Sequence, residues 1–450
     1  MEEFRAYVDE NADRFVAELK RLCRQPSIAA QNVGIEETAE MVLLMLKRTG
    51  AEARLVRVAG GPPVVYGSIG EGPRTLLFYN HYDVKPPGPL EQWESDPFAP
   101  EIRQGVLYAR GVADNKGDLV ARLMALEAYQ ATKGELPLKV KLVCEGEEEI
   151  GSAHLGQFVE ENGDLLDADG CIWEGAVMDI SGRPVIYLGA KGILSVELRV
   201  KGANRDLHSA WATLVPSPAW RLVWALASLK DEHGRLMVDR LTEHMGEPPP
   251  AEVDLLRRIP FEEKKIMADF GITYFVGGAE GIEALKRHLY GPTCNISGLR
   301  SGYMDEGYGS VLPCEAVVRL DFRLGPGLDP RLVLDLLRKH LDHLGFDDIR
   351  VVELNSTPSA MSPLDASIVR ADVEATRTIF GQEPVIYPIM AGAGPMYLFS
   401  EVLGIPTTSG VGVTHALCGM HAPNENIRIA DYIQGIKYIG ELIDRFAKEG

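Results

Sequence analysis

The sequence predicts an α/β fold, in which a mostly parallel β-sheet carries helices on both faces and a ferredoxin-like α+β domain is inserted. Apolar strands alternate with amphipathic helices in the first part of the chain, which is typical of a parallel sheet covered on both sides. Near Lys191 the pattern changes to strands that alternate apolar and polar residues, and the first pattern returns at Ser362. We therefore expect residues 1–191 and 361–450 to form one domain and residues 192–360 to form the inserted one.

The first domain begins with two helical patterns and continues with buried strands. Apolar residues recur at helical spacing over residues 2–22, and a second amphipathic helix over residues 35–48 ends before Gly50. A third helix is expected at residues 118–132. The expected strands are 53–58, 63–68, 75–80, 138–144 and 169–173, and residues 105–111 are expected to form a strand and a turn.

The inserted domain shows strand, helix, strand, strand, helix and strand, which is the split ferredoxin-like order. Its strands are expected at 193–200, 294–299, 316–324 and 349–354, and its helices at 218–230 and 330–344. A mainly helical stretch follows the Pro-rich residues 247–250. After the insertion we expect a helix at 362–380, a strand at 384–389 and a closing helix at 430–446.

Composition and charge exclude several classes of protein. The 450 residues are 46% hydrophobic and 25% charged, as in ordinary globular proteins, and the net charge of -19 argues against a nucleic-acid partner. No apolar run approaches the roughly 20 residues of a membrane helix, and the N-terminus lacks the features of a signal peptide. Six scattered cysteines favour free thiols in a reducing compartment. We therefore expect a cytoplasmic protein with no membrane partner.

Five side chains of metal-binding types follow predicted strands or turns. They are His81, Asp114, Glu149, Glu174 and His421. Two imidazoles and three carboxylates can hold two divalent ions if one carboxylate bridges them, and each ion then keeps a position open for water. Nitrogen and oxygen ligands suit zinc, with cobalt or manganese as alternatives. Asp83, two residues beyond His81, can hold the second N–H of that imidazole.

Each of these residues also has an ordinary structural interpretation. Asp114 can cap the helix that follows it, the acidic run 147–149 can be a solvated loop, and Glu174 and His421 can belong to a strand end and a turn. Three adjacent carboxylates directly after a buried strand repel one another, and a nearby cation would relieve that repulsion. The combination of residues, and not any single one, indicates a metal site.

Short motifs around these residues recur in a fixed order along nearly the whole chain. They are 80–83, Trp93, 96–98, 107–111, Asp114, 116–117, 145–152, 207–209 and 420–425. Together they resemble the two-zinc aminoacylase/carboxypeptidase G peptidase family, and most closely its branch of carnosinase and related dipeptidases. The resemblance implies that His81 and Glu174 hold one ion, that Glu149 and His421 hold the other, and that Asp114 bridges them. Many members have Asp where this chain has Glu174, and either carboxylate can bind zinc.

The resemblance also implies how the catalytic groups act. Glu148 matches the general base, which takes a proton from water and passes it to the leaving amine, and Asp83 matches the carboxylate behind the first histidine. A cis peptide bond is implied between Asp114 and Asn115. His208 matches an imidazole that the partner subunit supplies, which implies a homodimer with shared active sites.

Substrate recognition is the least defined part of the resemblance. Arg323 matches the arginine that binds the substrate carboxylate, and Asn295 matches a polar contact of the inserted domain. Relatives usually have Arg-Glu-Gly-Gly-Ser in the loop before the last catalytic helices, whereas this chain has Met-Ala-Gly-Ala-Gly-Pro at 390–395. Contact with substrate there would come from the backbone, at Gly394.

Three functions are compatible with these expectations. The first is cleavage of an amide bond in a dipeptide or short peptide that bears a free carboxylate. The second is the same chemistry on an N-acyl amino acid, as in acetylornithine deacetylases and succinyl-diaminopimelate desuccinylases. The third is a binding protein on a peptidase fold without catalysis, which the complete set of ligands and the base Glu148 argue against.

Overall fold

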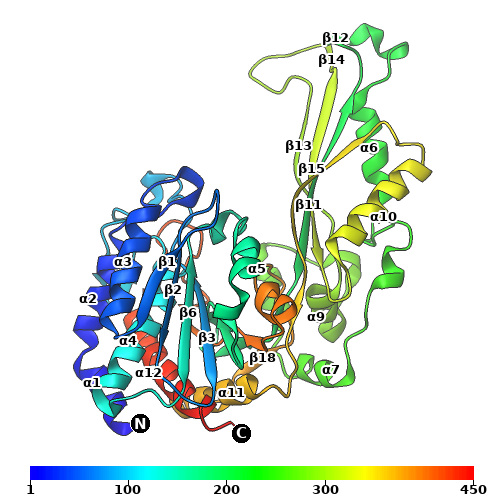
Figure 1. The fold of residues 1–450 in the computed structure, drawn as a ribbon. Helices are drawn as coiled ribbons and strands as arrows, with labels where there is room; N and C mark the ends of the chain where they lie inside the picture. Colours follow the sequence, from blue (N-terminus) through cyan, green and yellow to red (C-terminus); the bar gives the residue numbers. More distant parts are fainter. Residues whose placement is uncertain (450) are drawn as a thin grey trace. The chain divides into compact units, whose positions relative to one another are not determined.

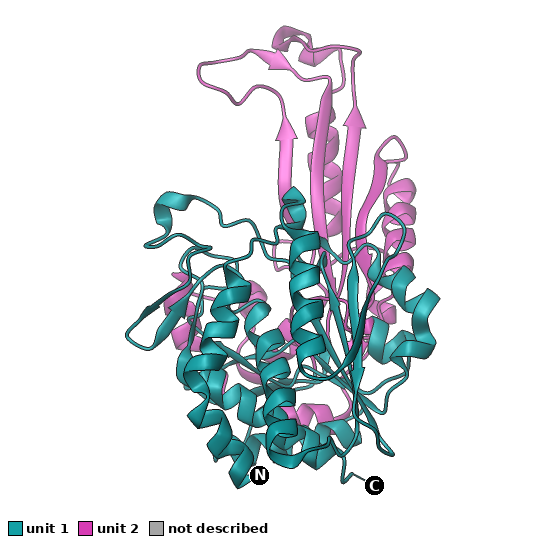
Figure 2. Cartoon of the chain, turned by 60° about the vertical axis from the view of Figure 1, so that its left-hand side comes forward, with its two compact units in different colours: residues 1–189, 361–388, 398–450 teal, residues 190–360, 389–397 magenta. Residues whose placement is uncertain are grey.

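The computed structural model describes residues 1–449, and these form two compact units (Figure 2). Unit 1 contains residues 1–189, 361–388 and those from 398 onward, and unit 2 contains residues 190–360 and 389–397. The expected division placed residues 389–397 in the first domain. In the structure the backbone N–H of Lys191 lies 3.2 Å from the carbonyl of Met390 and 2.9 Å from that of Gly392, so this segment groups with unit 2.

A six-stranded sheet forms the centre of unit 1, in the order β1-β2-β6-β3-β7-β19 (Figure 1). Its strands are β1 (Glu52–Val56), β2 (Val64–Ile69), β6 (Lys139–Glu145), β3 (Thr75–His81), β7 (Gly170–Trp173) and β19 (Thr407–Thr408). The pairs from β6 to β19 are parallel, whereas β2 runs antiparallel to both of its neighbours. The prediction of a mostly parallel sheet is confirmed.

Helices cover both faces of this sheet, as predicted. Along β3, Leu76 and Phe78 belong to the core of one face, and the alternate residues Leu77 and Tyr79 are buried on the other. The first face carries α1 (Glu2–Glu10), α2 (Ala12–Cys23), α3 (Ile35–Arg48), α4 (Lys116–Lys133), α11 (Ser367–Phe380) and α12 (Ile429–Phe446). The second carries α5 (Leu155–Leu166) and the short helix η7 (Leu398–Val402).

Shorter elements shape the loops of unit 1. One three-stranded sheet contains β4 (Glu101–Arg103), β5 (Val106–Tyr108) and β21 (Asn426–Arg428). Parallel pairs join β8 (Ala176–Met178) to β20 (Val411–His415) and β9 (Val185–Tyr187) to β18 (Val385–Tyr387), and β10 (Gly189–Ala190) pairs with β17 (Ala360–Met361). Single helical turns lie at η1 (Ala29–Gln31), η2 (Leu90–Gln92) and η3 (Glu148–Ile150).

Unit 2 is built on a four-stranded antiparallel sheet in the order β13-β15-β11-β16, which is the predicted ferredoxin-like arrangement. The strands are β11 (Gly192–Lys201), β13 (Asn295–Ser301), β15 (Glu315–Leu324) and β16 (Arg350–Thr357). An apolar core joins one face of the sheet to α6 (Pro218–Leu229) and α10 (Pro330–His343).

Unit 2 contains further short helices and strands. The helical stretch expected after residue 250 forms α7 (Pro250–Leu256), α8 (Glu263–Phe270) and α9 (Gly281–Tyr290). The short strands β12 (Leu207–His208) and β14 (Val311–Leu312) pair, and single turns lie at η4 (Ser209–Thr213), η5 (Leu241–His244) and η6 (Val276–Gly278).

One predicted helix was wrong in its extent. The helix expected over residues 2–22 is broken into α1 and α2 at Asn11, whose side chain donates a hydrogen bond to the Tyr7 carbonyl at 2.9 Å. An asparagine side chain that bonds to nearby backbone competes with the helical pattern. Among residues 1–449, none of the helices has the length and apolar character that crossing a membrane requires.

Candidate metal centre

Three neighbouring strands deliver polar side chains to one edge of the unit 1 sheet. His81 is the last residue of β3, Glu174 directly follows β7, and Glu148 and Glu149 lie in η3 just beyond β6. β3 lies between β6 and β7 and runs parallel to both. The carboxyl ends of parallel strands meet at the same edge, which is where α/β proteins place their sites.

The five predicted ligands and Glu148 lie in two neighbouring groups. One donor atom per residue lies within 4.8 Å of the others in each group, and the groups are His81, Glu148 and Glu174, and Asp114, Glu149 and His421. Asp114 links the groups, because its Oδ1 lies 3.0 Å from His81 Nε2 and its Oδ2 lies 2.9 Å from His421 Nε2. A carboxylate that lies between two imidazoles can bridge a pair of cations.

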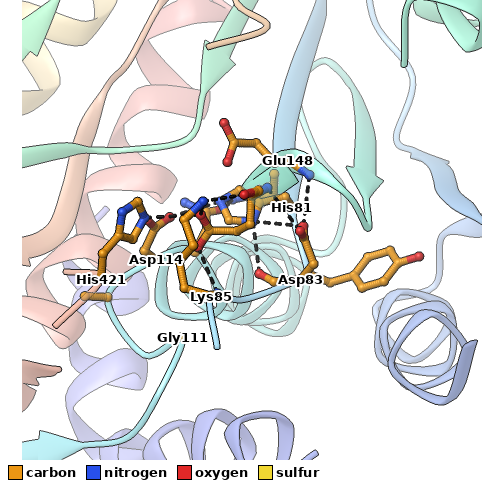
Figure 3. Close-up of polar contacts among 12 residues, drawn as sticks. His81, Asp83, Lys85, Gly111, Asp114, Glu148 and His421 are labelled. Carbon is orange, nitrogen blue, oxygen red and sulfur yellow. Dashed lines mark hydrogen bonds and ion pairs between the residues drawn. The ribbon is translucent and has the colours of Figure 1, made fainter. Parts of the chain in front are cut away.

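Asp83 is fully buried and holds the backbone of the acidic turn. Its Oδ1 and Oδ2 accept hydrogen bonds from the backbone N–H groups of Glu148 and Glu149, at 3.2 and 3.1 Å. The Nδ1 of His81 lies 3.3 Å from Asp83 Oδ1, so the Nε2 atom faces Asp114 (Figure 3). One side chain thus orients the first histidine and both glutamates.

The peptide bond between Asp114 and Asn115 is cis, as the resemblance implies. Asn115 directly precedes α4, and its Oδ1 accepts a hydrogen bond from Asn80 Nδ2 on β3. The Asn80 Oδ1 accepts in turn from the buried guanidinium of Arg122, at 2.6 Å. These contacts tie the start of α4 to the end of β3 and place Asp114 beside His81.

The electrostatics of the site favour positive charge. Burial alone would raise the pKa of Asp114, but hydrogen bonds from His421 and His81 hold that pKa below its ordinary value. Hydrogen bonds to Asp114 and Glu149 raise the pKa of His421 to about 10. Burial would lower the pKa of His81, but its contacts with Asp114 and Asp83 raise it well above the ordinary value. The carboxylates that favour positive charge on these imidazoles also attract divalent cations.

The two remaining carboxyls of the first group are shifted in the opposite direction. Burial raises the pKa of Glu148 to about 7, and the negative charges of Asp114 and Glu149 add to this effect. Burial and the charge of Glu148 raise the pKa of Glu174 well above its ordinary value. A carboxyl with a pKa near neutrality, such as Glu148, can both accept and return a proton at physiological pH.

The residues present fit divalent metal ions. Within residues 1–449, Glu174 Oε1 is buried and has no hydrogen-bond partner, although such atoms are normally satisfied. Glu174 and His421 both adopt left-handed backbone conformations, with φ of 48° and 62°. Such strain in residues other than glycine is concentrated at functional sites. The nitrogen and oxygen donors match zinc, cobalt or manganese.

The other predicted site residues belong to unit 2. His208 is exposed at the end of β12, where its Nδ1 accepts a backbone N–H at 3.1 Å. Arg323 lies on β15, on the sheet face opposite α6 and α10, because its neighbours in the strand are buried in the core with those helices. Asn295 lies on β13 and donates a hydrogen bond to Asp321 at 3.1 Å. Gly394 lies in the segment 389–397.

Two further residues of the site were not indicated by sequence patterns. The Lys85 ammonium lies 3.1 Å from Glu149 Oε2 and also donates to the Glu149 carbonyl. Glu425 is buried and accepts hydrogen bonds from the segment that carries Asp114. The signal for Lys85 was its place two residues after Asp83, in the loop beyond β3. The last motif contained Glu425 but suggested no role for it.

A comparison with protein families decides the class of this protein. A model of Peptidase family M20/M25/M40 matches residues 77–445, a range that includes both groups of ligands. The chain belongs to this peptidase family. It is therefore a metallopeptidase of the M20 type, and the family predicted from the motifs is confirmed.

Similar M20 proteins cover both units of the chain. The M20 family metallo-carboxypeptidase of Sulfolobus solfataricus has a TM-score of 0.92 at 37% identity, over 96% of this chain and 99% of that one. Human Beta-Ala-His dipeptidase is 26% identical, over 96% of this chain and 90% of its own. The Cys-Gly metallodipeptidase of Schizosaccharomyces pombe is 24% identical, over 97% of both chains.

Proposed function

We propose that this M20 peptidase uses two divalent cations to cleave the amide bond of a dipeptide or short peptide that carries a free C-terminal carboxylate. The observation that supports this most is Asp114, whose two oxygens contact the imidazoles of His81 and His421. We assign His81 and Glu174 to one ion, Glu149 and His421 to the other, and Asp114 to both. The expected metal is zinc, and the donor set also accepts cobalt or manganese.

Glu148 lies in the first group, but we assign it as general base and not as ligand. In this assignment the first ion has three protein ligands, which are His81, Glu174 and the Oδ1 atom of Asp114 beside His81. The pKa of Glu148, near 7, suits proton transfer instead. Two bound cations would lower the pKa of a water molecule and polarise the scissile carbonyl. Glu148 accepts the proton of the attacking water and returns it to the leaving amine. Asp83 holds the His81 side chain and the Glu148 backbone in position during the reaction.

The substrate class follows from the relatives and from unit 2. Several relatives at 24–37% identity that span nearly the whole chain are named dipeptidases or carboxypeptidase, whereas a succinyl-diaminopimelate desuccinylase matches only 46% of it. We propose that Arg323 binds the substrate carboxylate through its forked donors and that Asn295 and the backbone at Gly394 add polar contacts. An N-acyl amino acid is the less favoured substrate.

We further propose a cytoplasmic homodimer in which His208 completes the site of the partner subunit. His208 is exposed, and unit 2 also exposes apolar side chains on α6 and on the edge strand β13. These are Trp220, Val223, Trp224, Ile296 and Leu299. Apolar residues on an edge strand and an adjacent helix are typical of a surface that another subunit covers. The free cysteines support a reducing compartment.

Metal analysis and a substrate panel test the proposal. We expect two equivalents of metal per subunit, loss of activity after chelation, and recovery with zinc. A dipeptide and a longer peptide with a free carboxylate should be cleaved faster than an N-acetyl amino acid or a C-terminally amidated dipeptide. Preference for the N-acetyl amino acid would favour the deacylase function. Absence of metal-dependent cleavage in the whole panel would overturn the proposal.

A further inference from the structure

Glu425 is a buried carboxylate whose two oxygens are both fully used. It is 1% exposed. Its Oε2 accepts hydrogen bonds from the Arg110 guanidinium at 2.6 Å and from the backbone N–H of Gly111 at 2.9 Å. Its Oε1 accepts the backbone N–H groups of Ala113 and Asp114, at 2.8 and 3.0 Å. One side chain therefore holds the turn that presents Asp114.

The same residue joins this turn to the segment that carries His421. Asn426 pairs with Tyr108 where β21 runs antiparallel to β5, and the Glu425 carbonyl accepts the N–H of Ala109 at 3.1 Å. After Ala109 the backbone leaves this strand pairing and leads to α4. From there on the Glu425 carboxylate, and not its backbone, accepts the N–H groups of the turn. The connection is continuous from the strand pair to Asp114.

We propose that Glu425 is a positioning residue for the metal centre, which holds the bridging Asp114 and the ligand His421 at a fixed separation. Their side chains are 2.9 Å apart, between Asp114 Oδ2 and His421 Nε2. This inference rests on the proposed metal site, because it assigns a role to Glu425 through two of the proposed ligands.

The need for such a connection follows from where the ligands lie. His81 ends β3 and Glu174 follows β7, so the central sheet fixes them. Asp114 and His421 lie in turns outside that sheet, and the His421 side chain is 48% exposed. A carboxylate serves here because it accepts several N–H groups at once, and Arg110 compensates its buried charge.

If Glu425 positions these ligands, its replacement should weaken the binding of one metal ion more than that of the other. The ion held by Glu149 and His421 depends on the positions of both Asp114 and His421, which Glu425 connects. The ion held by His81 and Glu174 depends on Glu425 only through Asp114. Loss of the Glu425 charge should therefore weaken the second ion more than the first. The expected weakening is about 10- to 100-fold, the usual effect of removing a partner that orients a metal ligand.

Cobalt titration of the Glu425→Gln variant tests the inference. Cobalt absorbs visible light when bound by nitrogen and oxygen ligands, so the titration reports the number, affinity and geometry of bound ions independently of activity. We expect the wild type to bind two ions tightly and the variant to bind one tightly and one weakly, with an altered spectrum. Glu441→Gln is the matched control, because Glu441 is 3% exposed and also pairs with arginine, at 3.0 Å, but lies in α12.

A second variant keeps the test decisive if Glu425→Gln folds poorly. Arg110→Met combined with Glu425→Gln removes both buried charges, which avoids an unpaired guanidinium, and should still show the weak second ion. Two tight ions with the wild-type spectrum in the folded variants would overturn the role of Glu425 and leave the metal site standing. A wild type that binds no cobalt would overturn the proposed function and this inference together.

Discussion

At the scale of single residues, charge compensation explains why so many carboxyls can share one site. Asp83 accepts hydrogen bonds from the acidic turn and lies 3.3 Å from His81 Nδ1, and Asp114 lies between two imidazoles. Burial raises the pKa of Glu148 to about 7, and the negative charges of Asp114 and Glu149 add to this effect. The unequal surroundings distinguish the proposed proton-transfer group, Glu148, from Asp114, whose pKa is held below its ordinary value.

Replacing Glu148 by glutamine should leave metal binding unchanged and lower kcat by at least about 10²-fold, because the amide cannot accept the proton of the attacking water. Steady-state kinetics together with metal analysis measure both effects. Glu148→Asp keeps a carboxylate but shortens it by one methylene, and should give an intermediate rate. Turnover near the wild-type value in the glutamine variant would remove Glu148 from the proposed role.

A second prediction concerns Asp372, which lies in α11 away from the proposed ligands. Burial raises its pKa from an ordinary value near 3.9 to about 6, although Tyr438 and Thr408 donate hydrogen bonds to it. The native state therefore binds more protons than the unfolded state between about pH 4 and 6, so the free energy of unfolding falls as pH rises through this window.

Asp372→Asn should remove this dependence. Ionisation of Asp372 should lower the free energy of unfolding of the wild type by about 1 kcal/mol between pH 5 and 7. The variant should not show this decrease. Urea denaturation at both pH values measures the difference. Tyr438→Phe is the companion variant, because losing a hydrogen bond to the ionised form should steepen the dependence. Equal slopes in wild type and Asp372→Asn would contradict the assignment.

Sequence patterns identified the metal-type residues because each follows a recognisable strand or motif. His81 and Asp83 stand directly after an apolar run, and the acidic run ending at Glu149 follows another. They did not identify Lys85 or Glu425 as parts of the site. The contacts of these two residues are with a side chain or backbone far away in the chain, and spacing along the sequence carries no trace of such contacts.

At the scale of elements, the structure shows how local signals determine where a helix begins. α10 starts at Pro330, and Asp329 before it accepts the backbone N–H groups of Arg331 and Leu332 at 2.8 and 3.2 Å. Proline in the first turn and aspartate at the cap are the favoured residues for these positions. The helix then packs its apolar face against the unit 2 sheet.

Asp329→Ala should therefore destabilise unit 2 by about 1 kcal/mol, because it leaves two N–H groups of the first turn without their acceptor. Asp329→Asn keeps an acceptor and should lose much less. Chemical denaturation, monitored in the transition of unit 2, separates the two variants. An alanine variant as stable as the wild type would show that water replaces the cap without loss.

Long periodic elements were predictable, whereas several three-residue strands were not. The helix at 35–48 and the strand at 75–80 show clear periods of 3.6 residues or an unbroken apolar run, and the structure has them within one residue. β4, β8 and β9 have three residues each, which is too short for a period to show. The break at Asn11 depends on one side chain and is invisible to an average over the whole helix.

At the scale of the whole molecule, we propose that the site draws on more than one subunit. Unit 1 carries every proposed metal ligand and Glu148, and unit 2 carries His208 and Arg323. If His208 serves the partner, neither subunit is complete alone, and the dimer is the catalytic unit. The division of the site could be predicted only from family resemblance, because no pattern in one chain shows a contact between two.

Mixing two inactive proteins tests the shared site. A dimer of one His208→Ala subunit and one Glu148→Gln subunit has one site without either group and one intact site. Random exchange should therefore restore about a quarter of the wild-type activity, since half of the dimers are mixed and each has one working site. Activity measured after mixing and subunit exchange gives the answer. No recovery in a mixture shown to contain mixed dimers would place His208 in its own subunit's site.

The division of unit 1 into separate chain segments has a consequence for synthesis on the ribosome. α12 follows every other helix in the chain, yet it packs against α1, α4 and α11. The emerging polypeptide must therefore keep the apolar faces of the early helices uncovered until the whole of unit 2 has been translated. Exposed apolar surface of this kind attracts chaperones and aggregates readily. The N-terminal half of the protein should thus depend on chaperone protection during translation, while most of unit 2, as one continuous stretch, can fold as soon as it emerges.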